Sequence, residues 1–242
     1  GATRQMIDAG LEMPAWQFNL LARLTFRDTS IKAGSYEVSS GSSPLEILGK
    51  ITRGEFATAE IVFIEGWTFR QIRTALRSHQ AISHDSDSLA DSEIMSRLGS
   101  LQQHPEGWFY PDTYLFSKGE SDLAILERAY QAMQKQLQSE WQKRATNLPI
   151  KSPYEALILA SIVEKETGRA EDRPMIAAVF LNRLKNGMRL QTDPTVIYGL
   201  GAKFDGNLRK RHLDTDQAFN TYTRDGLPPR PIAMPSLASL QA

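Results

Sequence analysis

The 242-residue sequence contains no cysteine, and this absence excludes disulfides, zinc–thiolate sites and cysteine nucleophiles. It does not fix the compartment, because many proteins outside the cytoplasm also lack cysteine. Histidine is scarce as well. The four histidines, His79, His84, His104 and His212, are scattered and match no metal-ligand spacing such as H-E-x-x-H. The sequence therefore predicts neither a metal site nor a cofactor.

An excess of one charge is also missing, since 28 basic residues balance 28 acidic ones. This balance gives no indication of a nucleic-acid or anionic-membrane surface. A long apolar run is missing too: the most apolar central stretch, 156–163, is far below the roughly 20 residues that cross a bilayer. No signal peptide opens the chain, and no P-loop, dinucleotide fingerprint or G-x-S-x-G elbow occurs. We therefore expect a soluble fragment of a longer protein.

Helix start and stop signals are frequent. Ser43 followed by Pro44 predicts a helix N-terminus, and Gly54 predicts its end. Further helices are expected after Pro14, after Thr68, over 121–144, over 153–167 and over 172–187, and a strand over 57–64. The sequence thus predicts an α+β fold: a small N-terminal α/β unit followed by a mainly helical domain with short strands and loops.

Glu164 is the first candidate for chemistry. On the expected helix it shares a mostly apolar face with Leu157, Ala160 and Ser161, and it lies in the last turn. Burial there and the negative end of the helix dipole both favour a protonated carboxyl. A protonated carboxyl is what a general acid needs. The alternative is an ordinary glutamate at a helix end, solvated or paired with Lys165 or Arg183.

Two polar segments follow. The stretch 188–199 holds Gln191, Thr192 and Asp193 in what reads as a turn around Pro194, and the segment 219–223 holds Asn220 and Tyr222. Amide, hydroxyl and carboxylate groups at this density suit sugar binding. The alternative for both segments is an ordinary turn whose polar groups brace the loop. The aromatic run 107–114 is typical either of core packing or of stacking on sugar rings.

These segments resemble the MltG family, also called YceG-like, the endolytic murein transglycosylases. The resemblance rests on Ala160–Thr167, Val179–Leu184, Gly187–Gly199, Asn220–Tyr222 and Gly226–Pro229, with Gly107–Tyr114 and Ala33–Tyr36 upstream. It covers nearly the whole chain. Two departures are visible: Arg230 follows Pro-Pro where the family usually has Gly, and Met234-Pro-Ser236 replaces a more usual Asn-Pro-Gly. Both put the local loop in doubt.

The resemblance implies a domain plan: a LysM-like region over 1–80, a connecting segment over 81–106, and a transglycosylase domain over 107–242 that is truncated at its C-terminus. Family members carry an N-terminal membrane helix, so we expect a single-pass inner-membrane protein whose anchor is missing here and whose catalytic region is periplasmic. The implied partners are peptidoglycan glycan strands and peptidoglycan synthases.

The resemblance also implies the chemistry. Glu164 falls on the family's catalytic glutamate and is expected to cut the β-1,4 bond between N-acetylmuramic acid and N-acetylglucosamine, leaving a 1,6-anhydro end and terminating nascent strands. Gln191, Thr192, Asp193, Asn220, Tyr222 and Glu166 are expected to bind substrate. Two alternatives stay open: a hydrolase that uses water, with Asp193 or Glu166 as second carboxylate, and a non-catalytic glycan-binding module.

Overall fold

The structure, a computed structural model, describes residues 14–242 except 27, 31, 33–35, 39–40, 56 and 101–103. It divides into two compact units, one of 1–60 with 115–120 and one of 61–114 with 121–242. The expected domain plan, with a LysM-like region over 1–80, stays a prediction. Residues 33–35, part of the upstream match to the family, lie outside the described residues.

The first unit contains α2 (Ala15–Leu24), the 3-10 helix η1 (Asp28–Ser30) and α3 (Pro44–Arg53). The predicted start of α3 is confirmed by a capping box: the Ser43 hydroxyl accepts from the Glu46 N–H, and the Glu46 carboxylate accepts from the Ser43 N–H. Gly54 ends α3 at φ 74°, a conformation that glycine adopts without steric cost. The two α-helices share a small apolar core of Phe18, Ala22, Ile47, Leu48 and Ile51.

Short strands pair in the described part of the chain. β1 (Thr58–Val62) lies beside β3 (Thr113–Ser117), and β2 (Ile82–Ser83) lies beside β4 (Glu120–Ser121). Side chains alternate along β3, where Tyr114 and Phe116 are buried and their neighbours are more exposed. The expected strand over 57–64 is thus confirmed, and the chain is mainly helical with a few short strands, as its pattern indicates.

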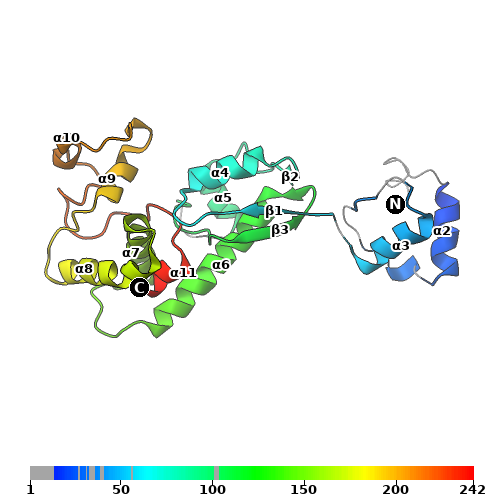
Figure 1. Cartoon of the computed structure of the whole chain (residues 1–242), viewed down its shortest axis with the longest axis horizontal. Coiled ribbons are helices and arrows are strands. Elements are labelled where there is room, and N and C mark those ends of the chain that lie inside the picture. The colour runs from blue at the N-terminus through cyan, green and yellow to red at the C-terminus, as the bar shows by residue number, and fades with distance from the viewer. Residues whose placement is uncertain are drawn as a thin grey trace. The chain divides into compact units, whose positions relative to one another are not determined.

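The second unit holds most of the helices (Figure 1). In chain order they are α4 (Phe69–Ser78), α5 (Asp91–Arg97), α6 (Asp122–Lys143), α7 (Pro153–Glu166), the 3-10 helix η2 (Ala170–Asp172), α8 (Arg173–Lys185), α9 (Asp193–Leu200), the 3-10 helix η3 (Gly201–Lys203), α10 (Lys210–Asp214) and α11 (Leu237–Gln241). None of the helices in the described residues combines the length and apolarity that crossing a membrane requires.

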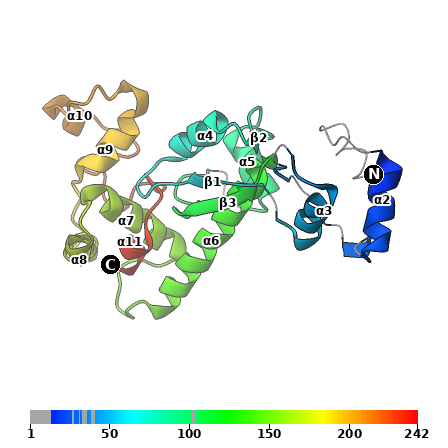
Figure 2. The ribbon, with the colours of Figure 1, turned by 45° about the vertical axis from the view of Figure 1, so that its right-hand side comes forward.

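Helix α7 is the centre of this unit. It packs against α6, α8, α9 and α11, and Figures 1 and 2 show these helices gathered around it. Every residue from Leu157 to Glu164 is buried, so α7 is enclosed on all sides over these turns. Its apolar side chains join a core that includes Phe180, Leu190 and Ile232. This enclosure fixes the direction in which the last residues of α7 point.

The structure decides two expectations about local structure, one on the segment 188–199 and one on the aromatic run 107–114. The segment 188–199 is not only a turn: α9 begins at Asp193, with Pro194 in its first turn, a position where the missing proline N–H costs nothing. The aromatic run packs as core. Phe109 is fully buried and stacks on Phe69, while Trp108 stacks on Tyr154 with ring centroids 5.8 Å apart. The core interpretation of the run is therefore the one that the structure supports.

Candidate active site

Two glutamates lie at the C-terminal end of α7, separated by one residue. Because successive helical residues turn by 100°, side chains two positions apart diverge by about 200°. Glu164 is buried with only 9% of its surface exposed, whereas Glu166 is exposed. The same helix end thus carries one carboxylate into the protein and another toward solvent.

Glu164 lies in a closed network of hydrogen-bond donors. The Arg173 guanidinium donates to its Oε1 at 3.0 Å. Its Oε2 accepts from the Ser236 N–H at 2.9 Å, from the Ser236 hydroxyl at 2.5 Å and from the Ser239 hydroxyl at 2.7 Å. Both oxygens are therefore engaged, and two of the donors, a guanidinium and a backbone N–H, can only donate. These contacts suit an ionised carboxylate that ties α7 to α8 and α11.

Glu166 has a different environment. Its Oε2 accepts a 2.7 Å hydrogen bond from the Thr192 hydroxyl, in the segment that the sequence singled out as a polar cluster. No hydrogen bond from the described part of the chain reaches its Oε1. Thr192 itself is buried, with 2% exposed, whereas Asp193 beside it is exposed. Glu166 is therefore a carboxylate that is anchored through one oxygen and open at the other.

The structure brings the two predicted polar segments together. The Gln191 N–H donates to the Thr221 carbonyl at 3.1 Å, and the Tyr222 hydroxyl donates to Asp193 at 2.6 Å. Arg189 contributes to the same junction, since its guanidinium donates to the Tyr222 carbonyl at 3.0 Å. Segments about 30 residues apart in the chain therefore form one polar surface beside Glu166.

Charges around Tyr222 act on its hydroxyl. Burial raises the pKa of Tyr222 to about 12, and the hydrogen-bonded Asp193 and the nearby Glu166 act in the same direction, opposed by Arg183. Negative charge next to the phenol disfavours phenolate, because a second anion there would be repelled. Tyr222 is therefore a neutral donor beside the carboxylates of Asp193 and Glu166.

Among the predicted substrate-binding residues, Asn220 has a bracing role in its contacts. It is fully buried, its amide nitrogen reaches the carbonyls of His212, Leu213 and Thr215, and its amide oxygen accepts from the Tyr222 N–H. These four hydrogen bonds use its polar groups to hold the loop. Asn220 was a candidate either for sugar binding or for holding the loop, and its contacts favour holding the loop.

Gln191 is exposed and keeps its side-chain oxygen on the Arg183 guanidinium. Its backbone is unusual, since φ is 53° in a residue that is not glycine. This left-handed conformation is sparsely populated for side chains with a Cβ, and it is found where surrounding structure enforces it. The turn between α8 and α9 is thus held in an uncommon shape directly before Thr192.

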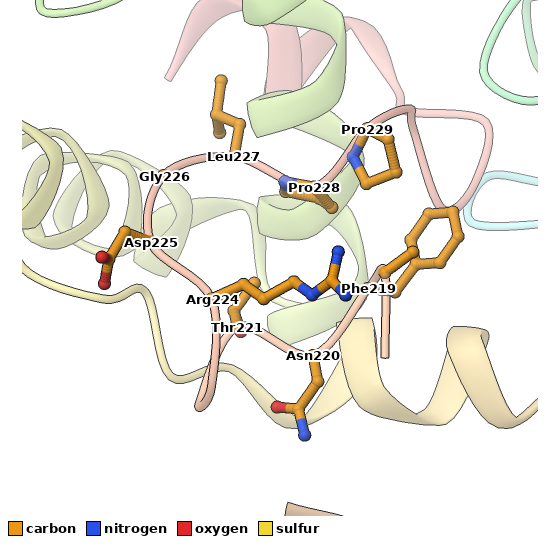
Figure 3. Close-up of a pocket in the computed structure, with 10 residues that line it drawn as sticks. Phe219, Asn220, Thr221, Arg224, Asp225, Gly226, Leu227, Pro228 and Pro229 are labelled. Atoms are coloured by element: carbon orange, nitrogen blue, oxygen red, sulfur yellow. The ribbon is translucent and has the colours of Figure 1, made fainter. Parts of the chain in front are cut away.

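A cavity of about 300 Å³ opens on the loop that follows (Figure 3). Phe219 and Pro229 lie at one end of it and Asp225 at the other, with the Arg224 side chain between. Arg224 is paired with Asp216 at 2.9 Å, so the cavity offers apolar rings and a charge-balanced rim. Thr221 lines the cavity, and its hydroxyl also accepts from the Thr192 N–H. The cavity therefore lies next to the polar surface beside Glu166.

Several residues of this region escaped sequence reasoning. Arg173, Ser236 and Ser239 surround Glu164, and no local pattern indicates that they meet it. The two departures from the family pattern both have structural partners. Ser236 caps α11 and bonds Glu164, and the Arg230 guanidinium lies 5.0 Å from the Phe219 ring centroid. Both residues that depart from the family pattern therefore make defined contacts in this structure.

Comparison with known proteins shows the family to which this fold and its paired polar segments belong. The model of the YceG-like family matches residues 2–242, and the chain belongs to that family. It is 34% identical over 233 residues to a Bacillus subtilis protein named endolytic murein transglycosylase, covering 88% of this chain and 64% of that protein. A protein of the same name from Streptococcus pneumoniae is 27% identical, with 88% and 44% covered.

A solved structure agrees with this assignment. The crystal structure of a yceG-like protein from Listeria monocytogenes is 30% identical and matches with a TM-score of 0.63, covering 94% of this chain and 80% of that one. The chain spans less than two thirds of the length of the two curated relatives. What those longer proteins do is therefore carried to this chain only as a proposal.

Proposed function

We propose that this chain cleaves murein glycan strands as a lytic transglycosylase, with Glu166 as its acid/base. The observation that carries the proposal is the exposed Glu166 carboxyl, which is held through one oxygen by Thr192 and lies beside Asp193 and Tyr222. General acid–base catalysis needs a carboxyl that is positioned and yet able to reach the substrate. Glu166 satisfies both requirements.

The choice of Glu166 over Glu164 follows from their contacts. The sequence favoured Glu164 because an apolar face would keep its carboxyl protonated. In its buried position Glu164 accepts four hydrogen bonds, one of them from the Arg173 guanidinium, and neither oxygen is open to a substrate. The same motif contains both glutamates, so the family resemblance is equally compatible with Glu166. Glu164 is the structural member of the pair in this proposal.

The proposed reaction needs only one carboxyl. Protonated Glu166 gives its proton to the glycosidic oxygen as the bond to C1 of N-acetylmuramic acid breaks. The sugar's N-acetyl group stabilises the oxocarbenium-like centre, as in substrate-assisted glycosidases. The Glu166 carboxylate then takes the proton of the C6 hydroxyl, whose oxygen bonds to C1 and closes a 1,6-anhydro ring. The nucleophile is intramolecular and already positioned, so no second carboxylate is required.

The finer parts of the proposal rest on the relatives' printed names and on the family resemblance. Cutting is endolytic, within nascent strands, and so ends their elongation. A murein substrate places the enzyme outside the cytoplasm, and in a bacterium with two membranes this is the periplasmic side of the inner membrane. Peptidoglycan synthases are the partners that this role would bring close.

Hydrolysis is the second candidate, and the position of Asp193 favours it. Asp193 is exposed, adjacent in sequence to Thr192 and bonded to Tyr222, so a second carboxylate is available near Glu166 to activate water. Two-carboxylate glycosidases use such a pair. In the transglycosylase proposal Asp193 instead orients Tyr222 and the substrate.

Product analysis separates these candidates. Uncrosslinked glycan strands of defined length would be incubated with the protein, and the fragments would be weighed by mass spectrometry. We expect new 1,6-anhydro ends inside the strands. Fragments one water heavier would establish the hydrolase instead. Binding without any new ends, in a preparation whose fold is verified by circular dichroism, would leave only a glycan-binding module.

A further inference from the structure

Thr192 was expected to bind sugar, yet its polar groups are already used. The side chain is buried, and its hydroxyl donates to the Glu166 Oε2 at 2.7 Å. Its backbone N–H donates to the Thr221 hydroxyl at 3.1 Å. A sugar hydroxyl would have to displace the bond to Glu166 in order to reach this side chain. The contacts of Thr192 point toward the protein and toward one carboxyl oxygen.

A second layer of threonines fixes Thr192 from behind. The Thr195 hydroxyl donates to the Thr192 carbonyl at 2.8 Å and lies 2.9 Å from the Thr221 hydroxyl. Thr195 is fully buried and Thr221 is 2% exposed, so water does not compete for these bonds. Both backbone polar groups of Thr192 are thereby held by hydroxyls, one from α9 and one from the segment 219–223. We call Thr192, Thr195 and Thr221 the threonine cluster.

The turn that precedes the cluster is held as firmly. Gln191 keeps its positive φ of 53° while its N–H bonds the Thr221 carbonyl and its side chain contacts Arg183. Backbone in this region is unfavourable for a residue with a Cβ and persists where several contacts enforce it, often at functional sites. The Gln191 conformation turns the chain so that the next hydroxyl meets Glu166.

We propose that Thr192 is the positioning residue of the acid/base: it holds Oε2 of Glu166 and thereby leaves Oε1 as the oxygen that gives and takes the proton. This inference rests on the proposed function. A carboxyl whose two oxygens are distinguished in this way presents its proton in one direction, and rate depends steeply on such positioning. The threonine cluster supplies the rigidity, and the Thr192 hydroxyl makes the hydrogen bond to the reacting carboxyl.

The charged and titratable groups near Glu166 come from three other elements. Asp193 belongs to α9, Tyr222 to the segment 219–223 and Arg183 to α8, and the charges of Asp193, Glu166 and Arg183 all act on Tyr222. These three groups are unchanged when the Thr192 hydroxyl alone is removed. A change at the Glu166 carboxyl in such a variant therefore reports the loss of the hydroxyl.

The test compares Thr192→Val, which keeps the shape and removes the hydroxyl, with Thr192→Ser, which keeps the hydroxyl. The matched control is Thr52→Val in α3, where the lost hydroxyl bonds only carbonyls of its own helix. We expect Thr192→Val to lower kcat by about 10- to 100-fold with KM within about threefold, and Thr192→Ser to recover most of the rate.

A readout without turnover keeps the inference separate from the proposed function. The ¹³C resonance of the Glu166 side-chain carboxyl, assigned by its loss in Glu166→Gln, should move in Thr192→Val relative to the wild type and stay in place in Thr192→Ser, because only the first variant loses the hydrogen bond to Oε2. An unchanged resonance and an unchanged rate in a folded Thr192→Val would overturn the positioning role, and so would an effect on KM alone. If the wild-type protein makes no new glycan ends, the proposed function fails, while the carboxyl resonance still decides whether Thr192 holds Glu166.

Discussion

The two sides of the α7 C-terminus differ in what they do with a carboxylate. On one side Glu164 is buried and surrounded by Arg173, Ser236 and Ser239, and both of its carboxylate oxygens accept hydrogen bonds from these residues. On the other side Glu166 is exposed, and its Oε2 accepts a hydrogen bond from the Thr192 hydroxyl. A buried and fully paired charge stabilises a particular packing, whereas a partly paired and accessible one can exchange a proton. Burial alone therefore does not identify the reacting residue.

The largest expected effect comes from the exposed side. Glu166→Gln should lower the rate of strand cleavage by about 100- to 10,000-fold, since an amide cannot deliver the proton. The melting temperature should stay close to that of the wild type, because a single hydrogen bond at the surface is altered. Glu171→Gln, another exposed glutamate in the same unit, is the control and should keep full activity. Normal cleavage by Glu166→Gln would return the assignment to Glu164.

The buried side should respond in stability. Glu164→Gln leaves the Arg173 guanidinium in a site where only 6% of its side chain is exposed, without its full counter-charge. Removal of one member of a buried ion pair typically costs about 3–5 kcal/mol of unfolding free energy. Urea denaturation measures this loss, and Arg173→Met should give a similar one. If Glu164→Gln unfolds like the wild type but does not cleave glycan, Glu164 is catalytic and the comparison is reversed.

A third carboxyl sharpens the comparison, because Glu106 is buried with only neutral donors in contact. Burial raises the pKa of Glu106 to about 7, while hydrogen bonds from the Phe69 N–H and the Tyr198 hydroxyl, and the charge of Arg230, lower it. A raised folded pKa means that this contribution to stability is complete below about pH 4.5 and is lost as pH rises through 7.

The Glu106 contribution corresponds to about 3 kcal/mol over that range, because the pKa of its carboxyl rises from the ordinary 4.5 to about 7. Urea unfolding at intervals from pH 4.5 to 8 should show this decline in the wild type. In Glu106→Gln the decline should be absent, since glutamine does not titrate. Glu93→Gln, an exposed substitution, should keep the wild-type slope. An equal slope in wild type and Glu106→Gln would show that Glu106 is ionised across the range.

The smallest effect is expected from Tyr222→Phe, which removes the 2.6 Å hydrogen bond to Asp193. A single partly exposed hydrogen bond contributes about 1 kcal/mol, so unfolding free energy and kcat/KM should each change only slightly. Steady-state kinetics on glycan strands of defined length measure the change in kcat/KM. A loss as large as that in Glu166→Gln would mean that the Tyr222 hydroxyl takes part in proton transfer.

Local elements were readable from the sequence where their signals are themselves local. Three helices begin at the hydroxyl residues that predict their start: Ser43, Thr68 and Ser121. Such signals are local, because a cap hydroxyl needs only the N–H groups of the following turn. The sequence of α9 favours a turn because turn-forming residues are dense there. Asp193 and Pro194 are nevertheless residues that commonly begin helices, and α9 begins at Asp193.

The candidate site shows the limit of such reading. The sequence identifies the segments 188–199 and 219–223 as polar, and the structure shows that they lie together. Their internal roles could not be read, because an amide or hydroxyl that binds a sugar looks the same in sequence as one that braces a loop. Asn220 illustrates this, since only the positions of three distant carbonyls reveal what its side chain contacts.

By itself, the sequence determined most of the longer helices, the family motifs and the presence of two glutamates at the end of α7, since these depend on residue type and spacing. Only the tertiary structure decided which glutamate faces the polar surface. Helix geometry makes residues 164 and 166 point apart, but which direction leads inward is set by α8, α11 and the segment after α9. Arg173, Ser236 and Thr192 meet the helix end only when the chain is folded, and their charges and hydroxyls divide the two carboxylates into a structural and a reactive one.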